Sequence, residues 1–381
     1  MTAAAAAKRR ADPTEDARFM EIAFALGRRG LGRTWPNPAV GAVVVRSSSG
    51  GPVIVGRGWT QPGGRPHAEI EALRRAGAAG RGATVYTTLE PCSHHGKTPP
   101  CADAIAAAGI ARVVSALEDP NPEVGGAGHA RLRAAGVAVE VGFGADEARR
   151  VHAGHIRRVA QGRPHVILKL AVSADGKAGL PGRRPAAITG EQARRRVHLL
   201  RATSDAVLVG IGTALADDPL LTCRLPGMTE RSPVRVILDT RLELPATGKL
   251  ASSARATPVW AIAGESADPR LGEALRACGV EVLRGEGDAG RIDLGAALKL
   301  LARCGITRLL VEGGPRVAAA FVTADLVDEA LLLRGPLTIG RDGIDALDGL
   351  PLSALAGSPR LVSRGVEEIG ADTVETFERS N

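Results

Sequence analysis

The chain of 381 residues contains few aromatic side chains: three Trp, one Tyr and five Phe, or 2% of the sequence. Its core must therefore be built from Ala, Val, Leu and Ile. Proteins that bind single-stranded nucleic acid stack bases on aromatic rings, so this scarcity argues against that function despite a net charge of +8. The basic residues are dispersed. They favour phosphorylated small molecules as partners, or simply a basic surface with no dedicated ligand.

Long hydrophobic runs are missing too. The longest, Ala39–Val45 and Ala206–Ile211, have the length of a strand and fall far short of the ~20 residues that a membrane helix needs. We therefore expect no membrane association. Residues 1–14 lack the Leu-rich core of a secretory signal, and we interpret them as a disordered leader before a cytoplasmic protein. Five cysteines, an odd number, argue against a disulfide framework and for a reducing compartment.

The chain does contain a regular alternation of strand and helix patterns, which predicts α/β domains. A prior of roughly 150 residues per domain suggests two or three of them. Residues 15–160 predict a three-layer α/β domain that ends in one amphipathic helix, Ala145–Ala160. A second unit begins near residue 161 and extends to residue 381, with a mostly parallel sheet.

Four residues in the first domain have the types and spacing of a catalytic zinc site: His67, Glu69, Cys92 and Cys101. His67 and Glu69 are two positions apart, so they can reach one cavity only from the start of a helix. Cys92 follows a predicted strand, and Cys101 follows two prolines that favour a helix start. One His and two Cys can hold Zn²⁺ and leave a fourth position for water. Glu69 is then free to carry protons, as in a hydrolytic deaminase.

A purely structural zinc site is the weaker alternative. Such a site needs four protein ligands, and the sequence offers only His94 and His95 as spare candidates nearby.

Further stretches extend the zinc pattern: Asn37–Gly41, Pro91–Cys101 and Glu118–Pro122. Together with His67–Glu69 they resemble the deaminase domain of the bifunctional deaminase–reductase family of riboflavin biosynthesis. The resemblance implies a cytidine-deaminase-like fold, one Zn²⁺ bound by the His and two Cys, and Glu69 as the catalytic residue. It also implies the substrate 2,5-diamino-6-ribosylamino-4(3H)-pyrimidinone 5′-phosphate, which loses its C2 amino group as ammonia.

The second unit contains weaker signals when its residues are considered alone. The turn Val311–Pro315 joins a strand to a helix, and its glycines allow backbone N–H groups to approach an anion. Asp217 and Asp218 form an acidic pair that also suits helix capping. Arg201 and Arg224 have the chemistry to clamp a phosphate, or they face solvent.

Five segments of the second unit, in matching order, are similar to the reductase domain of the same family: Lys169–Lys177, Ile188–Gly190, Val209–Thr213, Ala216–Arg224 and Glu312–Pro315. The resemblance implies a dihydrofolate-reductase-like fold. It also implies NADPH as a cofactor that reduces the ribosyl group of the deaminated product to a ribityl chain.

The same resemblance assigns residues to the two ligands. Expected contacts with NADPH are Val172, Thr213, Asp217, Thr240 and the turn from Gly314 to Ala320, including Pro315 and Arg316. Expected contacts with the substrate are Lys169, Arg201, Leu221, Arg224 and Glu312. Lys169 and Asp217 are the two candidates for proton transfer at the opening ribose. Pro185 and Ala187 stand where many family members have Ser and Trp, so the resemblance does not carry these two cofactor contacts over.

The sequence leaves two rival functions. The second unit could be a non-catalytic interaction domain, because the aromatic residue before Ile188 is missing. An RNA-editing deaminase would account for the basic pI of about 9.7. Homo-oligomerisation is left open, and we expect no nucleic-acid partner.

Overall fold

The computed structural model describes residues 13–94, 99–122, 124–183, 186–288 and 290–380. The chain divides into two compact units, Met1–Ala160 and Gln161–Asn381. Helix α1 (Pro13–Gly27) begins within the last two residues of the segment 1–14 that we interpreted as a leader. The remainder of that leader, residues 1–12, lies outside the described residues. No helix in the described ranges is both long and apolar enough to span a membrane.

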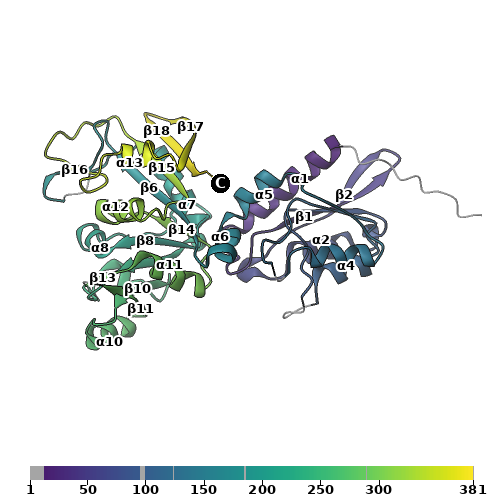
Figure 1. Cartoon of the computed structure of the whole chain (residues 1–381), viewed down its shortest axis with the longest axis horizontal. Coiled ribbons are helices and arrows are strands. Elements are labelled where there is room, and N and C mark those ends of the chain that lie inside the picture. Colours follow the sequence, from purple (N-terminus) through teal and green to yellow (C-terminus); the bar gives the residue numbers. More distant parts are fainter. Residues whose placement is uncertain (1–12, 95–98, 123, 184–185, 289, 381) are drawn as a thin grey trace, which may run out of the picture. The chain divides into compact units, whose positions relative to one another are not determined.

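The first unit, in which Figure 1 labels β1 and β2, is built on a five-stranded sheet. Its strand order is β2-β1-β3-β4-β5. Strand β1 pairs antiparallel with β2 and β3, while β3, β4 and β5 run parallel. The strands are β1 (Gly41–Ser48), β2 (Gly51–Trp59), β3 (Thr84–Thr87), β4 (Arg112–Ser115) and β5 (Ala138–Val141).

Helices cover both faces of this sheet. One face is covered by α2 (Ala68–Ala76), α3 (Cys101–Ala107) and α4 (Ala127–Ala134). These helices pack against the strand side chains that point to that face, such as Val44 and Val85. On the other face, α1 and α5 (Ala145–Val151) pack against the alternate strand residues. The period of two along a strand sends alternate side chains to opposite faces. The three-layer fold that we expected is confirmed.

One predicted helix is wrong in its extent. We expected a single helix over residues 145–160, but α5 ends at Val151 and α6 (Ala153–Gln161) begins after a break at His152. The buried ring of His152 places Nε2 3.1 Å from both the carbonyl and the hydroxyl oxygen of Thr88. This contact with a segment 64 positions away competes with continuous helix, and sequence periodicity does not report it.

The second unit contains a nine-stranded sheet in the order β11-β10-β9-β8-β14-β6-β15-β18-β17. The pairings from β11 to β15 are parallel, and β18 and β17 add to the edge antiparallel. The strands are β6 (His165–Val172), β8 (Ala206–Gly210), β9 (Val234–Leu238), β10 (Val259–Gly264), β11 (Glu281–Gly285), β14 (Arg308–Val311), β15 (Glu329–Arg334), β17 (Leu361–Ile369) and β18 (Asp372–Arg379). The expectation of a mostly parallel α/β unit is confirmed.

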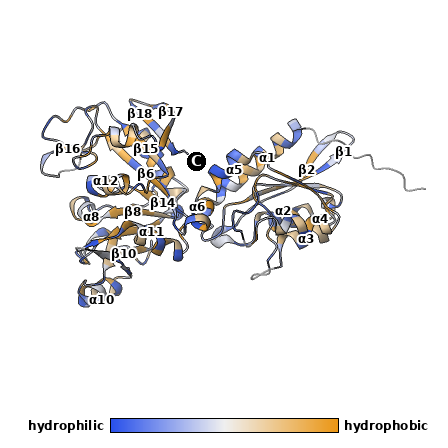
Figure 2. Ribbon diagram, in the orientation of Figure 1, coloured by the Kyte–Doolittle hydropathy of each residue, from blue (hydrophilic) through white to orange (hydrophobic). Residues whose placement is uncertain are grey.

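The helices of the second unit connect these strands: α7 (Glu191–Ala202), α8 (Ile211–Asp217), α9 (Lys249–Ser252), α10 (Pro269–Ala277), α11 (Leu294–Arg303), α12 (Pro315–Thr323) and α13 (Ser353–Ala356). Short pairs β7 (Lys177–Gly179) with β16 (Ile344–Asp345), and β12 (Gly287–Asp288) with β13 (Arg291–Ile292), complete it. The inner strands are continuous apolar runs (Figure 2), as expected where helices cover both faces of a parallel sheet.

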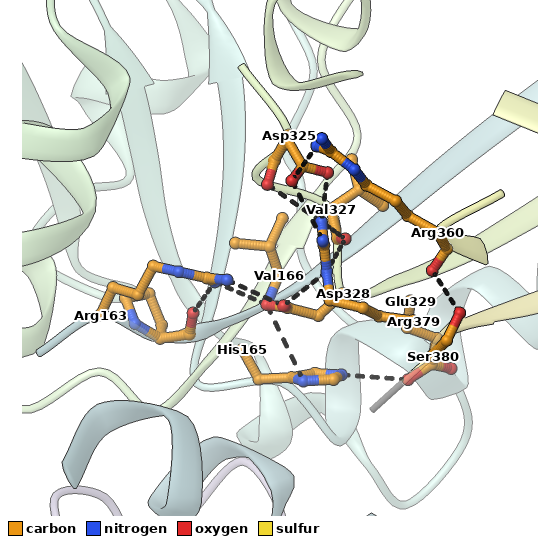
Figure 3. Close-up of polar contacts among 11 residues, drawn as sticks. Arg163, His165, Val166, Asp325, Val327, Asp328, Glu329, Arg360, Arg379 and Ser380 are labelled. Atoms are coloured by element: carbon orange, nitrogen blue, oxygen red, sulfur yellow. Dashed lines mark hydrogen bonds and ion pairs between the residues drawn. The ribbon is translucent and has the colours of Figure 1, made fainter. Parts of the chain in front are cut away.

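The sequence did not predict the C-terminal hairpin β17–β18, which a buried ion-pair network attaches to the sheet. Figure 3 shows the guanidinium groups of Arg163 and Arg379 converging on Asp328. Arg163 donates to both carboxylate oxygens at 2.6 and 2.9 Å, and the backbone N–H of Val166 donates to one of them at 2.9 Å. The start of β6 and the end of β18 are thereby joined through the loop before β15.

Candidate functional site

Two sulfur atoms and one ring nitrogen converge in the first unit. Nδ1 of His67 lies 3.6 Å from Sγ of Cys92 and 3.3 Å from Sγ of Cys101. Tetrahedral zinc, with Zn–S near 2.3 Å and Zn–N near 2.0 Å, separates such donor atoms by roughly 3.5 Å. The three side chains therefore fit this ion. Among the described residues no fourth side chain joins the group; His94 is described and stands outside it, and His95 lies outside the described ranges.

The elements that carry these three side chains explain why they meet. His67 is the N-cap residue of α2, and Cys101 is the first residue of α3. Cys92 lies in the loop after β3, and its sulfur accepts a hydrogen bond from the backbone N–H of Cys101 at 3.3 Å. A backbone donor at a helix start favours thiolate over thiol.

The two thiols differ in pKa. Hydrogen bonding with Cys101, followed by that with His67, lowers the pKa of Cys92 to about 4. Contact with Cys92 and burial raise the pKa of Cys101. Two sulfurs that share one proton behave in this way. A bound dication displaces that proton, because metal ligands must be deprotonated.

Glu69 lies in the first turn of α2 and is only 3% exposed. Burial raises the pKa of its carboxyl group. The hydroxyl of Thr87, which sequence reasoning did not select, lies 3.5 Å from Oε1 of Glu69. A buried carboxyl group whose pKa is raised holds a proton more readily, so it can donate one as well as accept one. Glu69 therefore has the environment of a general acid–base rather than that of a structural ion-pair partner.

The second unit contains a cavity of about 1600 Å³ on the side where β8, β9 and β14 end. Eleven of the residues that the resemblance assigned to NADPH or substrate line it: Lys169, Thr213, Asp217, Thr240, Glu312, Gly314, Pro315, Arg316, Val317, Ala319 and Ala320. Ala187 also lines the cavity, and Pro185 lies outside the described residues. Ligands of open parallel sheets bind at the carboxyl ends of the strands, and the cavity has this location.

Five other predicted residues do not line the cavity; one of them, Ala318, is fully buried in α12. Val172 is fully buried, and Leu221 is 4% exposed with a backbone φ of +54°. Arg201 is turned toward Glu312, and Arg224 is exposed. Sequence reasoning, conversely, did not select Arg291, which lines the cavity from the short strand β13. No local motif marks that position.

One wall of the cavity, at Lys169 and Glu312, belongs to a buried charge cluster. Arg201 donates to both carboxylate oxygens of Glu312, at 2.6 and 2.9 Å, and to the carbonyl oxygen of Thr222 at 3.1 Å. Burial alone would raise the pKa of Glu312, but Arg201 and Lys169 hold it below its usual value. Burial lowers the pKa of Lys169. A phosphate clamp would have to face the cavity, but Arg201 does not. It contacts Glu312, which lines the cavity.

The turn between β14 and α12 has no room for side chains at its glycines. A Cβ atom on Gly313 would lie 2.8 Å from the Cβ of Val317, and one on Gly314 would lie 2.7 Å from the hydroxyl of Thr213. Gly314 donates its N–H to that hydroxyl at 2.9 Å. Pro315 has no N–H, so the first free backbone donors of α12 begin at Arg316. The helix start faces the cavity and suits an anionic group.

The two acidic residues at the end of α8, Asp217 and Asp218, have different surroundings. Asp217 lines the cavity, and burial raises the pKa of its carboxyl group. Asp218 has a φ of +38° and accepts a hydrogen bond from the N–H of Lys249 at 2.8 Å, at the start of α9. Helix capping therefore applies to Asp218 and leaves Asp217 available to a ligand.

Comparisons with known proteins agree in both units. Residues 13–117 match the family described as the cytidine and deoxycytidylate deaminase zinc-binding region, and residues 164–374 match the RibD C-terminal domain. The chain is 40% identical over 376 residues to the riboflavin biosynthesis protein RibD of Escherichia coli K12, covering 94% of this chain and 98% of that protein. The corresponding protein of Bacillus amyloliquefaciens is 41% identical over 355 residues, covering 93% and 94%.

Solved structures show the same similarity over both units. Acinetobacter baumannii RibD superposes with a TM-score of 0.85 at 34% identity, covering 97% of this chain and 100% of that one. The diaminohydroxyphosphoribosylaminopyrimidine deaminase/5-amino-6-(5-phosphoribosylamino)uracil reductase of Thermotoga maritima gives 0.82 at 34% identity, covering 97% and 99%. Identity of this extent along the whole chain shows that the protein belongs to the RibD family, the bifunctional deaminase–reductases of riboflavin biosynthesis.

Proposed function

We propose that the chain catalyses two consecutive steps of riboflavin synthesis. The first is hydrolytic deamination of 2,5-diamino-6-ribosylamino-4(3H)-pyrimidinone 5′-phosphate. The second is NADPH-dependent reduction of the ribosyl group of the deaminated product to a ribityl chain. The observation that carries the proposal is the group of His67, Cys92 and Cys101, whose donor atoms lie 3.3 and 3.6 Å apart beside the buried Glu69. The Thermotoga maritima relative is named for both activities.

In the deamination, Zn²⁺ held by these three side chains would supply an open coordination position and lower the pKa of a water molecule there. Glu69 takes one proton from the attacking water and passes it to the ring nitrogen beside C2, and the second proton of that water, on the new hydroxyl group, then moves to the amino group. The bond from C2 to nitrogen breaks, ammonia leaves and a carbonyl group remains. The raised pKa of Glu69 suits this return of the proton.

In the reduction, NADPH would supply a hydride to C1′ of the ribose. The start of α12 at Gly314–Arg316 would hold its pyrophosphate, and Thr213, Asp217 and Thr240 lie along the same cavity. The bond from C1′ to the ring oxygen breaks, and that oxygen needs a proton. Lys169, whose pKa is lowered by burial, and Asp217, whose pKa is raised by burial, are the two candidate donors.

The two reactions can be tested separately on one protein. We expect about one zinc per chain, ammonia release from the diaminopyrimidine nucleotide, and NADPH oxidation on the deaminated product. Glu69→Gln should abolish ammonia release while zinc stays bound and NADPH oxidation continues. Asp217→Asn should impair NADPH oxidation only. Loss of both activities in either variant would contradict two independent sites.

The residue at position 187 motivates one rival. Ala187 lines the cavity where relatives of this kind were expected to present Trp, so the second unit could have lost its chemistry. A protein that releases ammonia but never oxidises NADPH would support this rival.

An RNA-editing deaminase, the other rival, would instead bind tRNA tightly and with a steep salt dependence at physiological ionic strength. We propose a small-molecule substrate, a cytoplasmic location and no nucleic-acid partner, and leave homo-oligomerisation open.

A further inference from the structure

Glu90 lies two residues before Cys92 and gathers four backbone N–H groups. Its side chain is buried, with 6% of the residue exposed. Oε2 accepts from Asp119 at 3.0 Å and from Gly126 at 2.9 Å, and Oε1 accepts from Gly128 at 2.8 Å and from His129 at 3.2 Å. A carboxylate that accepts several backbone N–H groups is strongly held in place.

Two of these donors belong to the first turn of α4. The N-cap residue of this helix is Gly126, which has no side chain to cap the helix. Ser, Thr, Asp or Asn commonly fills this role locally, but here Glu90 fills it from another segment of the chain. Its negative charge also lies at the positive end of the helix dipole. The start of α4 is thus fixed to the segment that contains a zinc ligand.

Close packing enforces the same contact. A Cβ atom on Gly128 would lie 2.0 Å from the carbonyl oxygen of Pro91 and 3.0 Å from Oε1 of Glu90. The backbone of α4 therefore rests directly on Glu90 and Pro91, the two residues before Cys92.

Helix α4 also contacts the segment of the other cysteine. Arg131 forms a bidentate pair with Asp103, whose second contact is 2.8 Å long, and it approaches the carbonyl oxygen of Ser93 at 3.5 Å. Asp103 lies in the first turn of α3, two residues after Cys101. Helices α3 and α4 lie side by side (Figure 2). One helix therefore contacts residues on both sides of Cys92 and a residue two positions after Cys101.

A second metal site is the alternative use of this region, because Glu90, Glu118 and His129 bring three ligand atoms together. The ring nitrogen Nδ1 of His129 lies 3.7 Å from Glu90 and 3.8 Å from Glu118. Each oxygen of Glu90 already accepts two N–H groups, however, and the side chain of Glu118 is 57% exposed. The arrangement is that of an anchored carboxylate rather than of a vacant ligand set.

We propose that Glu90 is a positioning residue of the zinc site. Through α4 it fixes where Cys92 stands relative to Cys101, and so sets the geometry of the sulfur pair. The inference rests on the proposed zinc site at His67, Cys92 and Cys101. Partners of this kind, which hold metal ligands in place, typically change metal affinity by about 10–100-fold when they are replaced.

The test uses the full chain with Glu90→Gln, in which one of the two acceptor oxygens becomes an NH₂ group facing backbone donors. We expect zinc to leave for a chromogenic chelator at least about tenfold faster than from the wild type. We also expect the sulfur-to-metal absorption bands of the Co²⁺-substituted protein to shift. Asp16→Asn is the matched control: Asp16 is also buried in the first unit and accepts from Tyr86 at 2.6 Å, but on the opposite face of the sheet.

The outcomes separate the two proposals. If Glu90→Gln keeps the zinc-loss rate and the cobalt bands of the Asp16→Asn control, the positioning role is overturned. A wild-type protein without about one zinc per chain would instead overturn the proposed zinc site. If Glu90→Gln does not fold, Arg131→Ala replaces it. Arg131 is 46% exposed, and its removal breaks the ion pair with Asp103 that joins α4 to the helix of Cys101. Unchanged cobalt bands in that variant would likewise count against the proposal.

Discussion

Replacing Arg201 by Met probes the buried charge cluster of the second unit. The side chains of Arg201 and Glu312 are 11% and 6% exposed and form two hydrogen bonds of 2.6 and 2.9 Å. Met fills a similar volume but leaves the carboxylate of Glu312 buried without its partner. Breaking a buried ion pair on one side costs about 3–5 kcal/mol. In a domain of this size each kcal/mol shifts the melting temperature by roughly 2–4 °C, so we expect a fall of about 6–20 °C.

The control is the same substitution on the same helix. Arg195 pairs with Glu191 near the start of α7, but the two side chains are 67% and 69% exposed. An exposed pair contributes only about 0–1 kcal/mol, so Arg195→Met should shift the melting temperature by a few degrees at most. Calorimetry of the second unit's transition provides the measurement. Equal shifts in the two variants would refute the assignment of Arg201 to a buried, stabilising pair.

The stability difference between the wild type and Arg201→Met should also depend on pH. The pKa of Glu312 is held low in the folded protein, so its ion pair contributes stability above the unfolded pKa and loses it as the pH falls through the folded value. The stability difference between wild type and Arg201→Met should therefore be full at pH 7 and shrink in acid, where protonated Glu312 needs no partner. A difference that stayed constant down to acid pH would show that lost packing, not charge, caused it.

Two further predictions concern the first unit. Burial lowers the pKa of His152 to about 3 in the folded protein. As the pH drops below about 6.5, the unfolded chain therefore binds a proton that the folded protein does not, and the free energy of unfolding decreases. Between pH 7 and pH 5 the wild type should lose about 2 kcal/mol more than His152→Gln in denaturant titrations, and parallel titrations would disprove the burial of a neutral ring. Gly41→Ala should destabilise by about 3 kcal/mol or more, because its Cβ would lie 1.8 Å from the carbonyl oxygen of Ala23. Gly50→Ala, with nothing within 4 Å, should be near neutral, and similar melting temperatures for the two would contradict the close approach of α1 to β1.

Sequence reasoning was enough to select His67, Cys92 and Cys101, which the structure brings together, and to predict most helices and strands. His67 and Cys101 were expected at helix starts, and the structure has them as the N-cap of α2 and the first residue of α3. Local rules are enough there, because prolines, strand ends and helix starts are encoded within a few residues. The assignment of Glu312, Gly314 and Asp217 to a ligand site of the second unit came from the resemblance to the reductase family, and all three line the cavity.

Tertiary structure alone decided the contacts that join distant segments. Arg201 faces Glu312 across 111 positions, and the carboxylate of Glu90 caps a helix that begins 37 positions later. The break at His152 and the attachment of β18 through Asp328 have the same origin. Periodicity and spacing report the backbone's local preferences. A buried polar group instead takes whichever partner the fold brings within hydrogen-bonding distance, since leaving it unpaired costs about 1–3 kcal/mol.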